Sequence, residues 1–392
     1  MNKALLHPEV ADFIRKNYKK VLPELILKGS PFPDISIQEL AIQLKGVKVA
    51  AKKFPLFYKN SNILYPPKLN LEQTSSEISA KHKASLIAGY SLTDLTGGFG
   101  IDSYFFSRNF SKINYCELNA ALVATARHNF KALNATNIKI YTGNSLEILV
   151  DHNLKSDWIY ADPARRDEYG DKVFKLSQCV PDIPKNLPLL WSFTNNIMLK
   201  TSPILDITAG INELEAIKEI HIVAVKNEVK EVLWILEKDF RESIILKTVN
   251  FEKDHIQKFE AIWKAETQSA NLAPPMEYLY EPNAAIMKSG LFNELAQKTE
   301  TQKLHINSHL FTSLELKKFP GRIFKIIDIE SFKSNHIKKR LKKLKANIAT
   351  RNFPLSVKEL RQKYKIKDGG NLYLFFTTNL NDEKIVIFCE KL

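Results

Sequence analysis

The chain has 392 residues, of which 44% are hydrophobic and 26% charged, and its formal net charge is +14; this predicts a globular, cytoplasmic protein and favours a polyanionic partner such as RNA. No apolar run approaches the roughly 20 residues of a membrane span, and the N-terminal sequence lacks the apolar core of a signal peptide, so we expect no membrane contact. The three cysteines, Cys116, Cys179 and Cys389, lie far apart, which argues against a structural metal site.

The first 70 residues are predicted to form a separate, mostly helical domain. Val10 and Ile14 recur at helical spacing, and Ser36 to Glu39 have the form of a capping box before another helix. The lysines at the end of this region are as compatible with a solvated helix face as with substrate contact. Residues 74–77 then supply N-cap candidates for a helix that leads into the first strand.

Residues 92–117 predict a strand, a glycine turn, a helix and a second strand. The first strand ends at Asp94, the second ends at Glu117, and the turn contains Thr96, Gly97, Gly98 and Gly100. Glycines at a helix N-terminus allow backbone amides to approach a ligand closely. An acidic residue at the end of the next strand can accept hydrogen bonds from two ribose hydroxyls.

Two ligands use such a turn, a nicotinamide dinucleotide and S-adenosylmethionine (SAM). The dinucleotide places a pyrophosphate over the helix N-terminus, whereas the methionine end of SAM carries an ammonium group. Asp94, directly ahead of the glycines, disfavours a pyrophosphate and favours the ammonium group. The sequence therefore favours SAM over a dinucleotide.

Two further strands are predicted to end in polar residues at the same edge of the sheet. The strand over 138–141 leads into a turn with Asn144 and Ser145, and Ser145 is expected to cap the following helix. The strand over 157–161 leads into Asp162, Pro163, Ala164 and Arg165. A carboxylate at this place lies in the crevice where open α/β sheets bind ligands.

The next hundred residues continue the alternation of strands and helices. We expect a flexible flap over 174–188, and then strands over 196–201, 219–225, 242–249 and 260–264, with helices over 205–215 and 229–236. This alternation is typical of a doubly wound sheet.

The chain after residue 268 is predicted to form small α+β units that end in a basic stretch. Short strands are expected over 305–310 and 323–329. Leu341, Leu344 and Ile348 recur at helical spacing among basic residues, so one face of a helix could pack while the other contacts phosphates. A merely solvated basic helix is the alternative. The candidate RNA-binding residues are Lys338, Lys339, Arg340, Lys342, Lys343, Lys345 and Arg351.

These motifs together resemble a bacterial group of class I SAM-dependent methyltransferases with a THUMP-like C-terminal domain. The residues that carry the resemblance are Leu95–Gly100, Asp162–Arg165, Tyr280–Asn283, Arg351–Leu355 and Gly369–Gly370. The resemblance implies an α/β fold with a Rossmann-like, doubly wound, seven-stranded sheet, a helical N-terminal part and small α+β C-terminal domains. It implies four domains: a helical domain (1–70), a SAM-dependent methyltransferase domain (71–267), a ferredoxin-like domain (276–330) and a THUMP-like domain (331–392).

The resemblance also assigns roles to individual residues. Asp162, Pro163, Ala164 and Arg165 would position the methyl acceptor. THUMP domains bind structured RNA, so tRNA or rRNA is the implied partner. The implied cofactor is SAM, held by Gln73, Ser76, Asp94, Thr96, Gly97, Gly98, Gly100, Glu117, Asn144 and Ser145.

Departures from the family pattern leave the acceptor open. Methyltransferases of amino groups have a second proline and an aromatic residue where this chain has Ala164 and Arg165. Carbon methylation of uracil needs a cysteine on the next strand, and residues 197–203 contain none. The sequence therefore favours direct methyl transfer to an RNA base. A non-catalytic RNA-binding protein and a methyltransferase of small molecules or proteins are the alternatives.

Overall fold

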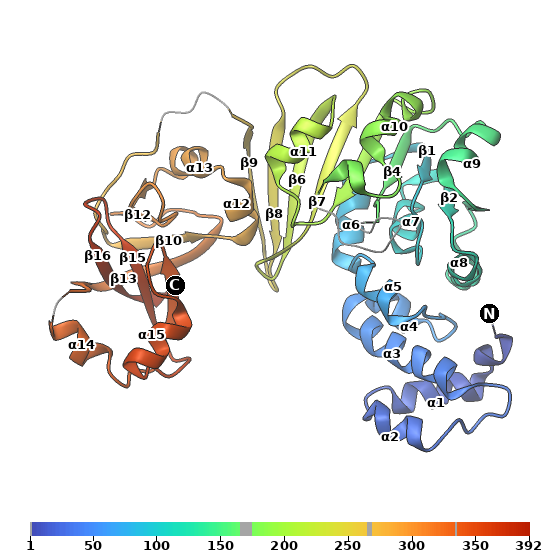
Figure 1. Cartoon of the computed structure of the whole chain (residues 1–392), viewed down its shortest axis with the longest axis horizontal. Coiled ribbons are helices and arrows are strands. Elements are labelled where there is room, and N and C mark those ends of the chain that lie inside the picture. Colours follow the sequence, from blue (N-terminus) through green and yellow to red (C-terminus); the bar gives the residue numbers. More distant parts are fainter. Residues whose placement is uncertain (1, 165–174, 265–268, 334) are drawn as a thin grey trace. The chain divides into compact units, whose positions relative to one another are not determined.

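The structure is a computed structural model that describes residues 2–164, 175–264, 269–333 and 335–392 (Figure 1). The chain divides into two compact units. The first unit comprises residues 1–218 and 233–241, and the second comprises residues 219–232 and 242–392. Each unit is described separately below.

The first unit begins with helices that share one apolar core with the strands after them. The Ser36 side chain accepts a hydrogen bond from the Glu39 backbone amide, and the Glu39 side chain accepts one from the Ser36 backbone amide. These two bonds confirm the predicted capping box. Val10, Ile14 and Leu40 are buried in the core that also contains Phe99 and Tyr115. Figure 1 shows the helices in blue. They are η1 (Lys3–Leu6), α1 (Pro8–Asn17), α2 (Leu22–Leu27), α3 (Ile37–Lys53), α4 (Pro55–Lys59), α5 (Lys68–Gln73) and α6 (Glu77–Leu86).

Strands β1 to β5 of this unit belong to a nine-stranded sheet with the strand order β3-β2-β1-β4-β5-β7-β6-β8-β9, of which β8 and β9 belong to the second unit. Strands β1 to β5 pair in parallel, and the order reverses at β1, where β2 lies on one side and β4 on the other. Ligands bind at such a reversal, outside the carboxyl ends of the strands. The strands are β1 (Gly89–Asp94), β2 (Phe110–Glu117), β3 (Ile138–Thr142), β4 (Trp158–Ala161), β5 (Asn196–Thr201), β6 (Ile217–Val225), β7 (Glu228–Glu237), β8 (Ile245–Phe251) and β9 (Ile256–Ile262).

The helices between these strands agree with the predicted alternation except around residues 174–190. There the described part forms a short 3-10 turn, η2 (Leu176–Gln178), and helix α10 (Ile183–Leu190). Ile183 and Leu187 are buried, so the expectation of a flap over this stretch is wrong for its described part. The other helices are α7 (Ile101–Phe106), α8 (Ala120–Ala132), α9 (Ser145–Asp151) and α11 (Ile207–Glu213).

The predicted helix over 229–236 is wrong, because this segment is strand β7. Lys226 and Asn227 both adopt positive φ angles, 53° and 59°, and form a two-residue turn between β6 and β7. Such a turn joins two antiparallel strands. The segment is rich in β-branched and aromatic residues, and Leu233 and Trp234 are fully buried.

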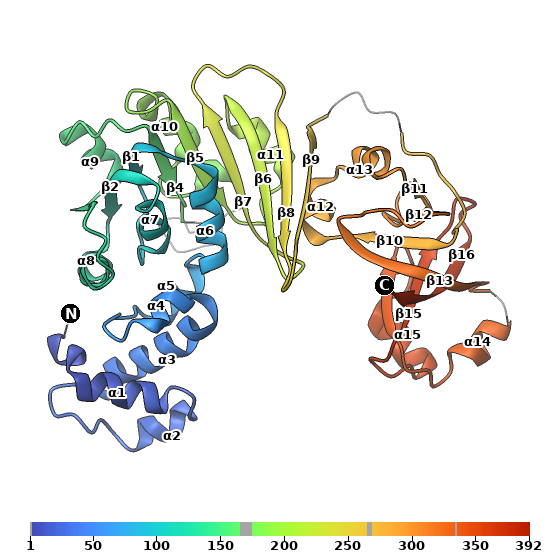
Figure 2. The same ribbon diagram turned by 180° about the vertical axis from the view of Figure 1, so that it is seen from behind.

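The second unit contains a seven-stranded sheet with the order β11-β12-β10-β13-β16-β15-β14 (Figure 2). Strand β13 (Gly321–Ser331) pairs with β10 (Tyr278–Pro282) along its first half and with β16 (Lys384–Lys391) further along. Its other elements are α12 (Ala284–Ser289), α13 (Phe292–Thr299), β11 (Gln302–Lys303), β12 (Phe311–Ser313), α14 (Asn335–Leu341), β14 (Asn347–Arg351), α15 (Val357–Tyr364) and β15 (Leu372–Thr378).

Two expectations for this unit are wrong in detail. Residues 305–310 form a turn rather than a strand, because His309 has a φ of 52° and the Leu304 amide bonds to the Leu310 carbonyl. The basic helix ends at Leu341, since Lys343 has a φ of 63°. Ile348 therefore lies in β14, which pairs in parallel with β15.

Candidate active site

The glycine turn joins β1 to α7 and is fixed by close packing. The Gly97 amide donates to the Cys116 carbonyl at 2.9 Å, and a Cβ at Gly97 would lie 2.2 Å from the Tyr115 ring. Gly98 has a φ of 55°, and a Cβ there would meet nothing nearer than the Thr96 carbonyl oxygen at 3.8 Å. Gly97 is therefore required by packing, whereas the space beside Gly98 is open.

Glu117, at the end of β2, contacts this turn directly. Its Oε2 accepts a hydrogen bond from the Gly98 amide at 2.8 Å, and its Oε1 accepts one from the Asn119 amide at 2.8 Å. The next residue, Leu118, is 73% exposed. Sequence reasoning missed Leu118, although an apolar residue directly after a strand-ending acid was visible in the sequence. The structure brings together a carboxylate, a glycine amide and an exposed apolar side chain.

Asp94 lies beneath the turn and is almost completely buried. Its carboxylate accepts hydrogen bonds from the Thr96 amide and the Ser103 hydroxyl. Burial raises the pKa of Asp94 to about 7, because a charged carboxylate is poorly solvated there. In this structure Asp94 holds the loop. A direct contact between Asp94 and a ligand stays a prediction.

Thr96 connects this turn to the end of β4. Its hydroxyl accepts a hydrogen bond from the Asp162 amide at 2.7 Å. Pro163 is buried, and Ala164 forms two backbone hydrogen bonds with Val180. The fourth residue of the predicted acceptor motif, Arg165, lies outside the described residues. The backbone of the acceptor motif is thus joined to the glycine turn.

The side chain of Asp162 faces β5, where it meets a residue that sequence reasoning did not assign. Lys200 Nζ lies 2.5 Å from Asp162 Oδ2. The side chain of Asp162 is 31% exposed and that of Lys200 is 13% exposed. Asp162 is therefore half of an ion pair at the carboxyl ends of β4 and β5.

A second ion pair joins helices α6 and α7. Lys83 is fully buried, and its Nζ lies 3.1 Å from Asp102 Oδ1. Asp102 Oδ2 also accepts hydrogen bonds from Ser75 and Tyr160. Burial raises the pKa of Asp102, but the charges of Lys83 and Lys200 outweigh that effect and hold the pKa below its ordinary value.

The remaining predicted cofactor residues lie at helix ends. Ser76 is the N-cap of α6 and accepts from the Ser79 amide, and Gln73 is the exposed last residue of α5. Asn144, not Ser145, caps α9, because the helix begins at Ser145 and the cap must precede it. The expected cap at Ser145 is therefore wrong. The Gly143 amide donates to the Glu117 carbonyl, which places the Asn144 backbone next to the end of β2.

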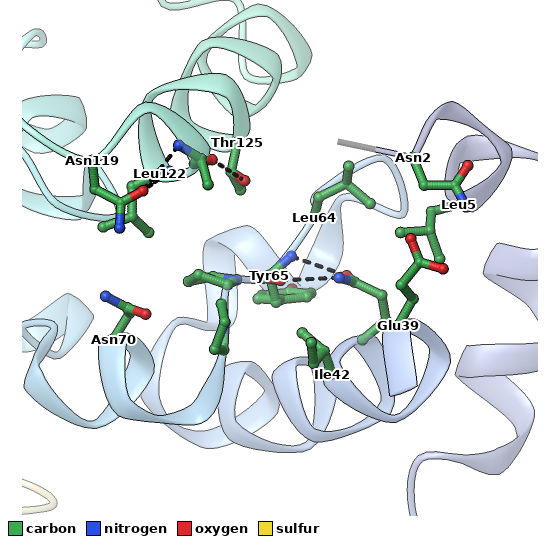
Figure 3. Close-up of a pocket in the computed structure, with 14 residues that line it drawn as sticks. Asn2, Leu5, Glu39, Ile42, Leu64, Tyr65, Asn70, Asn119, Leu122 and Thr125 are labelled. Atoms are coloured by element: carbon green, nitrogen blue, oxygen red, sulfur yellow. Dashed lines mark hydrogen bonds between the residues drawn. The ribbon is translucent and has the colours of Figure 1, made fainter. Parts of the chain in front are cut away.

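A pocket of about 220 Å³ lies in the first unit, beside the start of α8 (Figure 3). Figure 3 shows Tyr65 and Asn70 on one side of it and Leu122 and Thr125 on the other. Asn119, two residues beyond Glu117, lines it, but none of the predicted cofactor residues does. The strand ends, rather than this pocket, therefore define the candidate active site.

The predicted RNA-binding residues fall into two groups in the second unit. Arg340 is paired with Asp328 and Glu330, and Arg351 is paired with Glu281. These arginines stabilise the fold of the unit. The five lysines are exposed: Lys338, Lys339, Lys342, Lys343 and Lys345.

Two further lysines, missed in the sequence, lie beside the exposed group. Lys345 forms a β-bridge with Lys367, and the Lys343 amide donates to the Tyr364 carbonyl. Lys365 and Lys367 are exposed. We call Lys343, Lys345, Lys365 and Lys367 the lysine cluster.

Within the described residues, no group of three or more His, Cys, Asp or Glu side chains is placed to hold a metal ion. None of the helices in the described ranges has the length and apolar character that a membrane span requires. Cys116, Cys179 and Cys389 are buried and do not form disulfide bonds.

The parallel order β3-β2-β1-β4-β5, a glycine turn after β1 and an acidic residue at the end of β2 define the class I methyltransferase fold. The chain belongs to a family of class I methyltransferases with ferredoxin-like and THUMP-like domains. It is 30% identical to a candidate methyltransferase from Porphyromonas gingivalis W83 of known crystal structure. The comparison covers 99% of this chain and 98% of that one, with a TM-score of 0.88.

Two family models match the second unit. A ferredoxin-like domain matches residues 278–320, and a THUMP domain-like family matches residues 321–391. No curated protein matches the sequence.

Two further solved structures are much more distant. An rRNA methylase from Streptococcus thermophilus is 10% identical over 42% of this chain and 95% of that one, with a TM-score of 0.30. A candidate RNA methyltransferase from Pyrococcus horikoshii is 14% identical over 48% of this chain and 99% of that one, with a TM-score of 0.34. Both scores are too low to add to the family assignment.

Proposed function

We propose that this protein is a cytoplasmic, SAM-dependent methyltransferase that acts on a base of tRNA or rRNA. The observation that carries the proposal is a chain of hydrogen bonds across three strand ends. Glu117 on β2 binds the Gly98 amide of the turn after β1, and Thr96 of the same turn binds the Asp162 amide after β4. In this proposal Glu117 binds the donor and Asp162 positions the acceptor, on either side of the place where open α/β sheets bind ligands.

The residues of the turn fit an adenosyl donor. A ligand can approach Gly98 because the space beside it is open. Glu117 is half-buried, and each of its oxygens accepts one backbone amide, which leaves a lone pair on each for a ribose hydroxyl. Exposed Leu118 offers an apolar surface to a purine ring. Asn144, Gln73 and Ser76 are further contacts in this proposal.

The protein's own contribution to the reaction would be alignment and exclusion of water. SAM supplies a methyl group that is already activated by its sulfonium. Asp162 would hold the acceptor base in line with that methyl group, and Thr96 fixes the Asp162 backbone. Alignment of this kind can supply a large part of the barrier reduction in a transfer reaction.

The second unit supports RNA as the substrate. Its C-terminal residues match the THUMP domain-like family. The lysine cluster is exposed, and phosphates are the counter-charge that such a cluster attracts.

The change Asp162→Ala tests the proposal. We expect SAM affinity, measured by titration calorimetry, to stay within about twofold, because Glu117 and the glycine turn are untouched. We expect transfer of a labelled methyl group to RNA to fall by about a hundredfold or more, because the acceptor loses its positioning group. Asp12→Ala, at an exposed aspartate on α1, is the control and should leave both quantities unchanged.

Other outcomes separate the alternatives. Absence of SAM binding by the wild-type chain, together with tight tRNA binding, would favour a non-catalytic RNA-binding protein. Methyl transfer without RNA, at a rate insensitive to salt, would favour a small-molecule or protein methyltransferase. Undiminished transfer by Asp162→Ala would remove Asp162 from its proposed role.

A further inference from the structure

The ion pair between Asp162 and Lys200 is built into the sheet. Strands β4 and β5 pair in parallel with Ala161 opposite Leu199, so the next residues along the two strands are Asp162 and Lys200. The Lys200 Nζ and Asp162 Oδ2 atoms lie 2.5 Å apart, and both side chains retain some exposure. An acceptor bound at Asp162 would therefore meet a carboxylate and an ammonium group together.

This pair is poorly suited to methylation of an exocyclic amine. The nitrogen of an amine becomes positively charged as its lone pair attacks the methyl group. Hydrogen-bond acceptors favour that reaction and a nearby cation disfavours it, because developing charge in the transition state is stabilised by the opposite charge. Here the ammonium group of Lys200 offsets the carboxylate and would oppose the developing positive charge.

The pair is well suited to a lactam, which is a ring N–H beside a carbonyl. The Asp162 carboxylate can accept the N–H hydrogen, and Lys200 can donate to the carbonyl oxygen. When the ring nitrogen loses its proton, negative charge spreads onto that oxygen, where the Lys200 ammonium group stabilises it. Adenine and cytosine also present a donor beside an acceptor, but their methylation at the amine develops the wrong charge for Lys200.

We propose that the acceptor is the lactam edge of a uracil or guanine base in RNA, with Asp162 as the proton acceptor and Lys200 as the group that stabilises the oxyanion. This inference rests on the proposed methyltransferase function. In the transfer step, the ring nitrogen uses its lone pair to form the new N–C bond, and its proton passes to Asp162. The C–S bond of the donor breaks with its electrons remaining on sulfur, and the proton leaves Asp162 for solvent.

The identity of the product tests the inference. The purified full chain is incubated with SAM carrying a labelled methyl group and total RNA from cells that lack the gene, and the labelled nucleosides are identified by mass spectrometry. We expect N3-methyluridine or N1-methylguanosine. N6-methyladenosine, N4-methylcytidine or N2-methylguanosine would overturn this inference while leaving the methyltransferase proposal intact. Absence of label from every RNA would overturn the methyltransferase proposal itself.

Variants at Lys200 separate catalysis from structure. We expect Lys200→Met to lower kcat/KM by about a hundredfold or more, as loss of an oxyanion donor does. Its log kcat/KM should rise with pH with a slope near one, because the nucleobase must then ionise without an ammonium group to stabilise its oxyanion. Lys200→Arg should restore part of the rate. Lys155→Met, at an exposed lysine that precedes β4 at the opposite end of that strand, is the matched control.

SAM affinity provides the second readout. Titration calorimetry should give the same SAM affinity for Lys200→Met as for the wild-type chain, since the proposed role of Lys200 is toward the acceptor and not toward the donor. A wild-type rate in Lys200→Met would overturn the role of Lys200. A lower rate with an unchanged pH profile would also overturn it and leave Lys200 as a structural residue.

Discussion

Asp94 is a buried carboxylate that holds the glycine turn of the candidate active site in place. Its oxygens are occupied by the Thr96 amide and the Ser103 hydroxyl, and only 1% of the residue is exposed. The carboxylate thus fixes the turn whose Gly98 amide donates to the Glu117 carboxylate and whose Thr96 hydroxyl accepts from the Asp162 backbone amide. Burial raises the pKa of Asp94 to about 7.

This raised pKa predicts a specific dependence of stability on pH. An unfolded aspartate loses its proton near pH 4, and folded Asp94 loses it near pH 7. Between these values the folded protein binds the extra proton, so stability falls as pH rises from about 4 to about 7. The variant Asp94→Asn has no such proton, so its melting temperature should fall less between pH 5 and pH 8 than that of the wild-type chain.

Thermal unfolding at these two pH values is the measurement. Asp151→Asn, at an exposed aspartate at the end of α9, should behave like the wild-type chain. An equal fall in the Asp94→Asn variant and the wild-type chain would show that Asp94 titrates in the ordinary range.

Short-range sequence signals predicted part of the site at the residue scale. Glu117 and Gly98 lie 19 positions apart, but the strand-turn-helix-strand pattern places them together, and the structure joins them by a hydrogen bond. Lys200 lies 38 positions from Asp162, and only the register of β4 on β5 brings the two side chains together. That register depends on tertiary packing, which the local sequence does not encode.

The glycine turn is the element on which the site depends, and its glycines have different physical reasons. Gly97 packs against the Tyr115 ring, whereas Gly98 has a positive φ beside open space. The change Gly97→Ala should lower the free energy of unfolding by about 2 kcal/mol or more, because the Cβ overlaps a buried ring. Gly98→Ala should cost only about 1 kcal/mol, from backbone strain.

Urea denaturation and calorimetry with SAM check this contrast. We expect Gly98→Ala to weaken SAM binding more than its small loss of stability would suggest, because the methyl group occupies the ligand's approach. Gly290→Ala, at a positive φ with nothing within 4 Å, provides the control for backbone strain alone. Equal stability losses for Gly97→Ala and Gly98→Ala would contradict this account.

The strand-helix alternation predicted the elements around the crevice and failed further along the chain. Residues 229–236 carry apolar side chains that suit both a helix and a buried strand. Their place in the sheet between β5 and β6 makes them a strand. The deciding local signal was the two-residue turn at Lys226 and Asn227. Non-glycine residues with positive φ angles are difficult to recognise in a single sequence.

At the scale of the whole molecule, the basic residues behind the net charge of +14 serve two purposes: some form ion pairs within the fold, and others are exposed on the surface. Arg340 and Arg351 are used in ion pairs, while the lysine cluster is exposed. The triple change Lys343→Ala, Lys345→Ala and Lys367→Ala should weaken RNA binding by about tenfold or more at moderate salt. The slope of log affinity against log salt should decrease by about 0.7 for each lost phosphate contact.

Filter binding of tRNA at several salt concentrations is the measurement. Lys253→Ala, at an exposed lysine between β8 and β9, is the matched control and should leave both affinity and slope unchanged. An unchanged slope in the triple variant would place the RNA on another surface.

Strand β13 contributes backbone hydrogen bonds to β10 on one edge and β16 on the other. The ferredoxin-like and THUMP-like segments consequently share one sheet, and we expect neither to fold as an autonomous module. A cut between them would leave a long row of unsatisfied amides and carbonyls, which invites aggregation. Gene shuffling that transferred one segment without the other would therefore yield an insoluble product, and the two should be inherited together.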